Sequence, residues 1–166
     1  DEFVRPVQWC VLLYGDKVVP ATILGANSGA LTRGHRFMHP QPITLKTPAD
    51  YEQALEEGKV IASFAARRER IRKLVEQEGA KLGARAIIEE ELLDEVAALV
   101  EWPVALTGNF DKAFLAVPQE ALISAMKGHQ KCFHLLDAQG NILPHFITLS
   151  NLVSRDPAQV VAGNEK

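Results

Sequence analysis

Hydrophobic and polar positions follow a strand-like pattern in the first part of the chain. Residues 7–14 form an apolar, β-rich run, a Gly-Asp pair follows at 15–16, and a second β-rich run covers 17–24. Because glycine reaches positive φ at little cost, this arrangement predicts a hairpin. Pro20 lacks a backbone donor, so we expect the second strand to lie at a sheet edge. The stretch 25–46, rich in glycine and proline, is expected to be irregular.

The middle of the chain follows the helical period. Thr47 is a favourable N-cap, Pro48 is a favourable first helical residue, and Gly58 marks the end of the short helix that they predict. Two longer helices are predicted over 63–82 and 89–100, where apolar residues recur every three or four positions.

The last third of the chain combines both patterns. Its predicted elements are a strand over 103–110, a helix over 118–126, and a second hairpin formed by 131–136 and 142–150. The order of elements predicts an α+β fold, with a mainly antiparallel sheet built from two hairpins and with packed helices. We expect one domain over 1–166 that carries a helical insertion at about 47–100.

Composition and charge narrow the class of protein. Hydrophobic residues make up 47% and charged residues 23%, which is typical of a globular domain with a real core. A net charge of −3 argues against a nucleic-acid binder with a positive field over its whole surface, but leaves a local basic patch open. No apolar run approaches the roughly 20 residues of a membrane span. The distant Cys10 and Cys132 indicate reduced thiols, and the chain starts without methionine, so we expect a cytoplasmic piece of a longer protein, without a membrane partner.

The sequence TRGHRF at 32–37 is the first candidate for a binding site. Arg33 and Arg36 are suited to hold phosphate through charge-assisted hydrogen bonds, and Gly34 would let the backbone approach. His35 can donate or accept a proton near neutral pH. The alternative is a polar turn whose arginines cap carbonyls or pair with acidic residues of this chain. The residues alone leave both interpretations open.

A second basic stretch lies at 126–133, with the sequence MKGHQKCF. Every second position in this stretch is basic, at Lys127, His129 and Lys131. Together with TRGHRF these residues could form a basic surface for a polynucleotide backbone. The alternative is a set of solvent-exposed side chains at a junction between helix and strand.

No self-contained reactive centre is predicted. His129, Cys132 and His134 are ligand types that zinc takes, but no second cysteine stands nearby, and the two histidines would face opposite sides of a strand. We expect no metal site. Sequence motifs of nucleophile elbows, phosphate loops and dinucleotide sites are missing, so no catalytic residue is predicted.

Short blocks of sequence then indicate a family. In order they are RPV at 5–7, GHRF at 34–37, EWP at 101–103, VPQE at 117–120, HQKCF at 129–133 and GNEK at 163–166. In this order they resemble the β subunit of the bacterial two-subunit glycyl-tRNA synthetase, over essentially the whole chain. The resemblance implies an internal section of that subunit. It also implies similarity to the B3/B4-type region of the phenylalanyl-tRNA synthetase β chain.

The resemblance implies a function as well. The family joins glycine to tRNA(Gly) in an α2β2 assembly, with ATP and magnesium used on the α subunit, so no cofactor is expected in this section. The implied partners are the α subunit, tRNA(Gly) and the rest of the β subunit. The section is expected to be non-catalytic and to support tRNA positioning and assembly; a scaffold without RNA contact and a vestigial aminoacyl-tRNA editing domain are alternatives. Six residues are implied to contact either the tRNA backbone or, at an interface, the α subunit or the rest of the β subunit: Arg33, His35, Arg36, Lys127, His129 and Lys131.

Overall fold

The computed structural model describes residues 6–128 and 130–153. The chain divides into two compact units, Asp1–Ala62 and Ser63–Lys166, and each is described here by itself. The helical insertion predicted at about 47–100 is shared between these units, since its first helix belongs to one unit and its other two helices to the other. That residues 1–166 form a single domain stays a prediction.

The first unit consists of short strands and one helix. Its strands are β1 (Cys10–Val11), β2 (Leu13–Tyr14), β3 (Lys17–Val18), β4 (Thr22–Ile23), β5 (Ala26–Gly29), β6 (Leu31–Arg33) and β7 (Pro42–Thr44). These strands form the sheets β1-β5-β4, β2-β3 and β6-β7. The pairing of β1 with β5 is parallel, and the other pairs are antiparallel.

The first predicted hairpin is confirmed close to its turn. Gly15 has a φ of 61° and lies between β2 and β3, which pair with each other. Farther from the turn the two runs separate, because β1 and β4 pair with β5 instead. The prediction that 25–46 is irregular is wrong, since β5, β6 and β7 lie there. The sequence Ala26–Gly29 consists of small and polar residues, so no alternating apolar pattern announces its backbone pairing.

The short predicted helix is confirmed, with a tight first turn. It begins as η1 (Pro48–Asp50) and continues as α1 (Tyr51–Glu57), and Gly58 is its C-cap. The backbone N–H and the hydroxyl of Thr47 both donate to Asp50 Oδ2, each at 3.0 Å. These hydrogen bonds fix the start of the helix beside the strands of the first unit.

The second unit is built on one antiparallel sheet. Its strands are β8 (Arg85–Ala86), β9 (Val104–Asn109), β10 (Phe133–Leu136) and β11 (Ile142–Ser150), in the order β8-β10-β11-β9. The second predicted hairpin is confirmed as β10 and β11. The two hairpins lie in separate sheets, because β2 and β3 pair only with each other, in the first unit.

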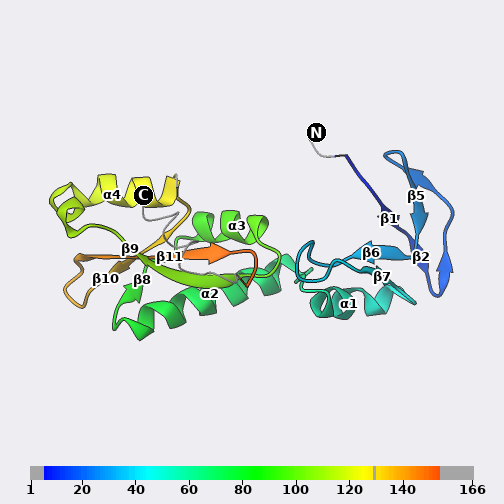
Figure 1. The fold of residues 1–166 in the computed structure, drawn as a ribbon, viewed down its shortest axis with the longest axis horizontal. Coiled ribbons are helices and arrows are strands. Elements are labelled where there is room, and N and C mark those ends of the chain that lie inside the picture. The colour runs from blue at the N-terminus through cyan, green and yellow to red at the C-terminus, as the bar shows by residue number, and fades with distance from the viewer. Residues whose placement is uncertain (1–5, 129, 154–166) are drawn as a thin grey trace. The chain divides into compact units, whose positions relative to one another are not determined.

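The remaining elements of the second unit are α2 (Phe64–Lys81), α3 (Glu90–Leu99), η2 (Lys112–Ala116) and α4 (Gln119–Gly128). Figure 1 shows α2 running along the sheet. Residues of α2 and α3 share one core cluster with Phe133, Leu135 and Ile147, whereas Met126 of α4 packs with Phe146 in another. Because Phe146 and Ile147 are neighbours on β11, their side chains point to opposite faces of the sheet. Helices therefore cover both faces.

Charged side chains hold α2 and α3 together on their exposed sides. Arg68 of α2 forms ion pairs with Glu90 and Asp94 of α3, and Arg72 Nη2 lies 2.9 Å from Glu90 Oε1. Hydrogen bonds from Arg72 and Arg68 lower the pKa of Glu90 below its ordinary value. Arg68 and Arg72 of α2 are thus matched to acids on the next helix. The α+β prediction is confirmed by the fold as a whole.

Candidate functional site

The TRGHRF segment begins with Thr32 and Arg33 at the end of β6 and continues into a tight turn. The His35 side chain is 2% exposed, and its Nδ1 accepts hydrogen bonds from the backbone N–H groups of Phe37 and Met38, both at 3.2 Å. The His35 N–H donates to the Gly58 carbonyl at 2.7 Å. A buried ring that accepts backbone hydrogen bonds organises the turn. We therefore assign His35 a positioning role in this turn.

Gly34 lies directly against the end of α1. A Cβ atom at this position would stand 2.3 Å from the Gly58 carbonyl oxygen and 2.9 Å from the Gly58 Cα. Real Cβ atoms do not approach that closely, so the turn and the helix end can meet only when position 34 is glycine. The close approach that the sequence predicted at Gly34 is therefore occupied by the chain's own backbone.

The two arginines of the turn point outward from this anchor. Arg33 and Arg36 are both exposed, and neither forms an ion pair with any residue that the structure describes. Arg33 Cζ lies 6.0 Å from the centre of the Trp9 ring, and Arg36 Cζ lies 5.6 Å from that of Phe37. Each guanidinium thus combines an unneutralised charge with an aromatic surface.

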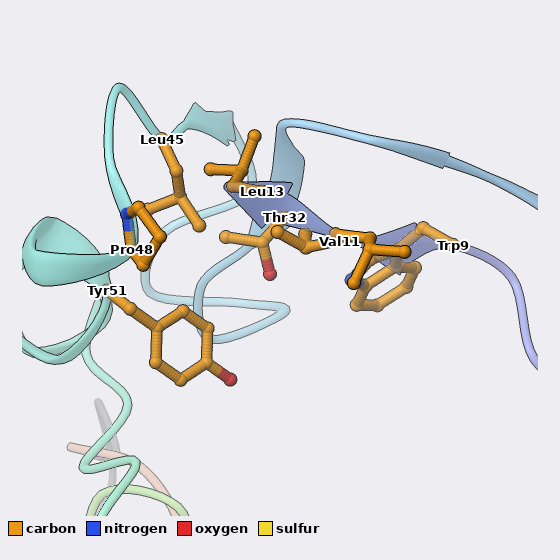
Figure 2. A pocket seen from close by; sticks show the side chains of 8 residues that line it. Trp9, Val11, Leu13, Thr32, Leu45, Pro48 and Tyr51 are labelled. Atoms are coloured by element: carbon orange, nitrogen blue, oxygen red, sulfur yellow. The ribbon is translucent and has the colours of Figure 1, made fainter. Parts of the chain in front are cut away.

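A pocket opens beside these residues. Its volume is about 470 Å³, and the residues that line it come from the segment 9–13 around β1 and β2, from β6, from the residue after β7, from η1 and from the start of α1. In Figure 2 the Tyr51 and Trp9 rings lie on two sides of the pocket, with Thr32 and Val11 between them. Thr32 and Leu45 are 6% and 3% exposed and form the floor.

The lysines of the second basic stretch are already paired. Lys127, in the last turn of α4, forms ion pairs with Glu89 and Glu91, and its hydrogen bond to Glu89 raises its pKa. Lys131 Nζ lies 2.7 Å from Glu95 Oε1. Acidic residues at the start and middle of α3 therefore neutralise both lysines. The alternative of fully solvent-exposed lysines does not describe these paired side chains, and a contact of either lysine with RNA stays a prediction.

The six predicted contact residues do not form one described cluster. Arg33, His35 and Arg36 belong to the first unit, while Lys127 and Lys131 belong to the second. His129 lies outside the described residues. A basic surface that joins the two stretches stays a prediction.

The second unit offers no activated nucleophile at Cys132. Its side chain is 2% exposed, and its thiol donates to the Gln130 carbonyl at 3.2 Å. Burial raises the pKa of this thiol to about 11, so it is protonated at neutral pH. Burial also lowers the pKa of His134.

Residues 6–128 and 130–153 contain no group of three or more His, Cys, Asp and Glu side chains arranged to hold a metal ion. Their helices are also too short or too polar to cross a bilayer.

The family model described as glycyl-tRNA synthetase beta subunit matches residues 1–166. The chain belongs to this family. It is 60% identical over 165 residues to the glycine–tRNA ligase beta subunit of Chromohalobacter salexigens, and 56% identical over 170 residues to that of Marinobacter nauticus. The corresponding subunit of Hahella chejuensis is 54% identical over 166 residues. Each match covers 99% of this chain and 24% of the relative. The chain therefore spans about a quarter of the length of these family members.

Sequence reasoning missed the aromatic part of the site. The sequence pattern places Trp9 within an apolar strand and Tyr51 within the first turn of a helix. In the structure these residues are 43% and 42% exposed. A large aromatic residue directly before a strand, three positions after a proline, is a local signal that could have pointed to Trp9. Its proximity to Arg33 depends on β1 and β6 meeting in the folded unit, and no spacing rule predicts that contact.

Proposed function

We propose that this chain is a non-catalytic section of a glycine–tRNA ligase beta subunit, and that it helps to bind and position tRNA(Gly) and to assemble the enzyme. The observation that carries the proposal is the pair Arg33 and Arg36, exposed, unpaired with described acids and stacked on aromatic rings. Guanidinium groups bind phosphate oxygens well, and exposed rings give unpaired bases a surface to stack on. The family membership of the chain makes tRNA the relevant polynucleotide.

In this proposal the bond-forming chemistry takes place on the alpha subunit, with ATP and magnesium, in the cytoplasm. The section described here contributes by holding the tRNA in a productive orientation. Orientation of reactants can account for roughly 7–11 kcal/mol of a barrier without any reacting side chain. The inert Cys132 thiol and the paired lysines fit such a supporting role.

A second candidate function, protein assembly without RNA contact, is favoured by a separate observation. Large hydrophobic side chains are exposed throughout the described part of the first unit, which favours a surface covered by another part of the enzyme. They are Trp9, Tyr14, Val18, Val19, Ile23, Leu24, Leu31, Phe37 and Tyr51. The partner would be the rest of the beta subunit or the alpha subunit.

The proposal is tested by reversing the charge of Arg33 and Arg36 in the complete two-subunit enzyme. The double variant Arg33→Glu, Arg36→Glu is expected to weaken tRNA(Gly) binding, and the slope of log K against log salt should fall by about 1 for each lost phosphate contact. Formation of glycyl-adenylate should not change. The measurement is a tRNA binding titration over a salt series.

The matched control is Lys17→Glu, Lys46→Glu, which makes the same change of net charge at two exposed lysines of the first unit. It should leave the salt slope close to that of the parent enzyme. If the arginine variant stays assembled and binds tRNA normally, the proposal is refuted. If the complex dissociates instead, protein assembly is the function of this surface.

A further inference from the structure

The pocket in the first unit is lined by aromatic, aliphatic and hydroxyl-bearing side chains, and neither Arg33 nor Arg36 is among them. Two aromatic rings, Trp9 and Tyr51, border it, and no charged side chain lines it. Figure 2 shows the Thr32 hydroxyl directed into the space between Tyr51 and Val11. Within the described ranges, the hydroxyls of Thr32 and Tyr51 make no side-chain hydrogen bond. The pocket therefore offers stacking surface together with two available polar groups.

A cation stands at the border of the same pocket. The Arg33 guanidinium lies over the Trp9 ring, and Trp9 is itself one wall. Arg33 follows Thr32 on β6, so the strand carries a pocket-facing hydroxyl and an outward-facing cation at successive positions. The Trp9 ring and the Thr32 hydroxyl thus both line the pocket, and the Arg33 cation lies against that ring.

An unstacked nucleotide matches this combination more fully than an apolar peptide side chain does. Its base stacks on aromatic rings, its polar edge hydrogen-bonds to hydroxyls, and its phosphate binds a guanidinium. A hydrophobic side chain would fill the pocket but would leave both hydroxyls and the cation without a role. The volume of about 470 Å³ lies within the range of roughly 300–1,000 Å³ that is usual for small-molecule sites.

We infer that this pocket binds one unstacked base of the tRNA, with the adjoining phosphate at Arg33. The inference rests on the proposed function, because it names the part of the RNA that the Arg33 surface receives. Trp9 and Tyr51 stack on the base, and Thr32 binds its edge. The site selects single-stranded RNA, because a base within a duplex cannot enter.

The inference is tested in the complete two-subunit enzyme with Trp9→Ala and Tyr51→Ala. Each substitution is expected to raise the Kd for tRNA(Gly) by roughly 5- to 100-fold, as the loss of a base-stacking ring does elsewhere. The slope of log K against log salt should stay unchanged, because a stacking contact releases no counterions. Trp9→Phe, which keeps an aromatic ring, should bind tRNA close to the parent level.

Two further variants keep the test decisive. Thr32→Val preserves the shape of the floor and removes one hydroxyl, so a rise in Kd of roughly 2- to 10-fold is expected even if Trp9→Ala prevents folding. Tyr14→Ala is the matched control, since Tyr14 is 82% exposed in the same unit and does not line the pocket. It should not change the Kd.

The outcomes separate this inference from the proposed function. If the Arg33 and Arg36 variant weakens tRNA binding but the Trp9, Tyr51 and Thr32 variants do not, the base pocket is wrong and the proposed function stands. If none of them weakens binding, both are wrong. If the pocket variants lower the yield of the assembled enzyme while the assembled fraction binds tRNA normally, the occupant is a protein segment, and the inference is overturned.

Discussion

At the scale of single residues, the candidate site depends on a contact between two glycines. Gly34 and Gly58 bring the turn after β6 against the end of α1, and the His35 N–H donates to the Gly58 carbonyl at 2.7 Å. The flanking residues Arg33 and Arg36 are held outward by this arrangement. Local backbone packing therefore determines where the two cations point.

Substitution of Gly34 by alanine should loosen this turn. The new Cβ would stand 2.3 Å from a backbone oxygen, which cannot rotate away as a flexible side chain can. Such overpacking typically costs about 1–3 kcal/mol. We expect faster deuterium uptake, measured by mass spectrometry, in peptides that cover the turn and the end of α1.

The control for this substitution is Gly29→Ala in β5. A Cβ at Gly29 would meet nothing closer than 3.9 Å, so the same chemical change is accommodated there. Deuterium uptake around the turn should match that of the parent protein. Equal protection in the Gly34 and Gly29 variants would show that the two-glycine contact does not hold the turn.

Exposure of individual residues was only partly predictable from the sequence. The exposure of Arg33 and Arg36 follows from their charge and from their places at a strand end and in the turn after it. The pairing of Lys127 and Lys131 does not, because their partners, Glu89 and Glu95, are more than thirty residues away along the chain. Charge neutralisation of this kind becomes visible only when the elements are packed.

At the scale of secondary structure, elements with local start and stop signals were predicted well. Ser63 accepts a hydrogen bond from the Ala66 N–H at the start of α2, and Gly83 adopts a φ of 63° just after its end. The strands β5, β6 and β7 carry no such signals, and β8 has only two residues. Their positions depend on pairing partners elsewhere in the chain, so periodicity alone could not find them.

The turn between β10 and β11 provides a pH-dependent prediction. Asp137 Oδ1 accepts hydrogen bonds from the backbone N–H groups of Gln139 and Asn141, at 2.9 and 2.8 Å. Hydrogen bonds from Asn141 lower the pKa of Asp137 below its ordinary value. The stabilisation is therefore complete above the unfolded pKa and is lost as the pH falls through the folded one.

Asp137→Asn should accordingly destabilise the second unit at neutral pH, and the difference from the parent protein should shrink in acid. The measurement is urea unfolding of both proteins at several pH values between about 3 and 7, a range that includes the ordinary aspartate pKa. A difference in free energy of unfolding that stays constant over this range would show that the carboxylate charge is not what stabilises the turn.

At the scale of the whole molecule, buried apolar residues are distributed unequally. Among the described residues of the first unit, the buried hydrophobic side chains are Ala26, Leu45 and Leu55. The second unit contains two core clusters, built around the faces of a four-stranded sheet. The sequence showed a composition rich enough for a core, but it could not show that nearly all of that core would be gathered after residue 62.

This distribution predicts different behaviour of the two units when they are produced separately. A fragment of residues 63–166 should unfold cooperatively with heat or urea, because it keeps both core clusters intact. A fragment of residues 1–62 should show a broad, non-cooperative transition, because a chain of that length with few buried apolar residues is marginal without a covering partner. Circular dichroism and amide NMR dispersion would distinguish the two.

The result also bears on what covers the first unit. If its exposed hydrophobic surface is part of an interface, adding the remainder of the beta subunit in trans should sharpen the transition of the 1–62 fragment, since a ligand that binds the folded state stabilises it. A sharp, cooperative transition of 1–62 alone would mean that the unit is self-sufficient. Its exposed apolar residues would then have to be explained by a binding role and not by the need for a partner during folding.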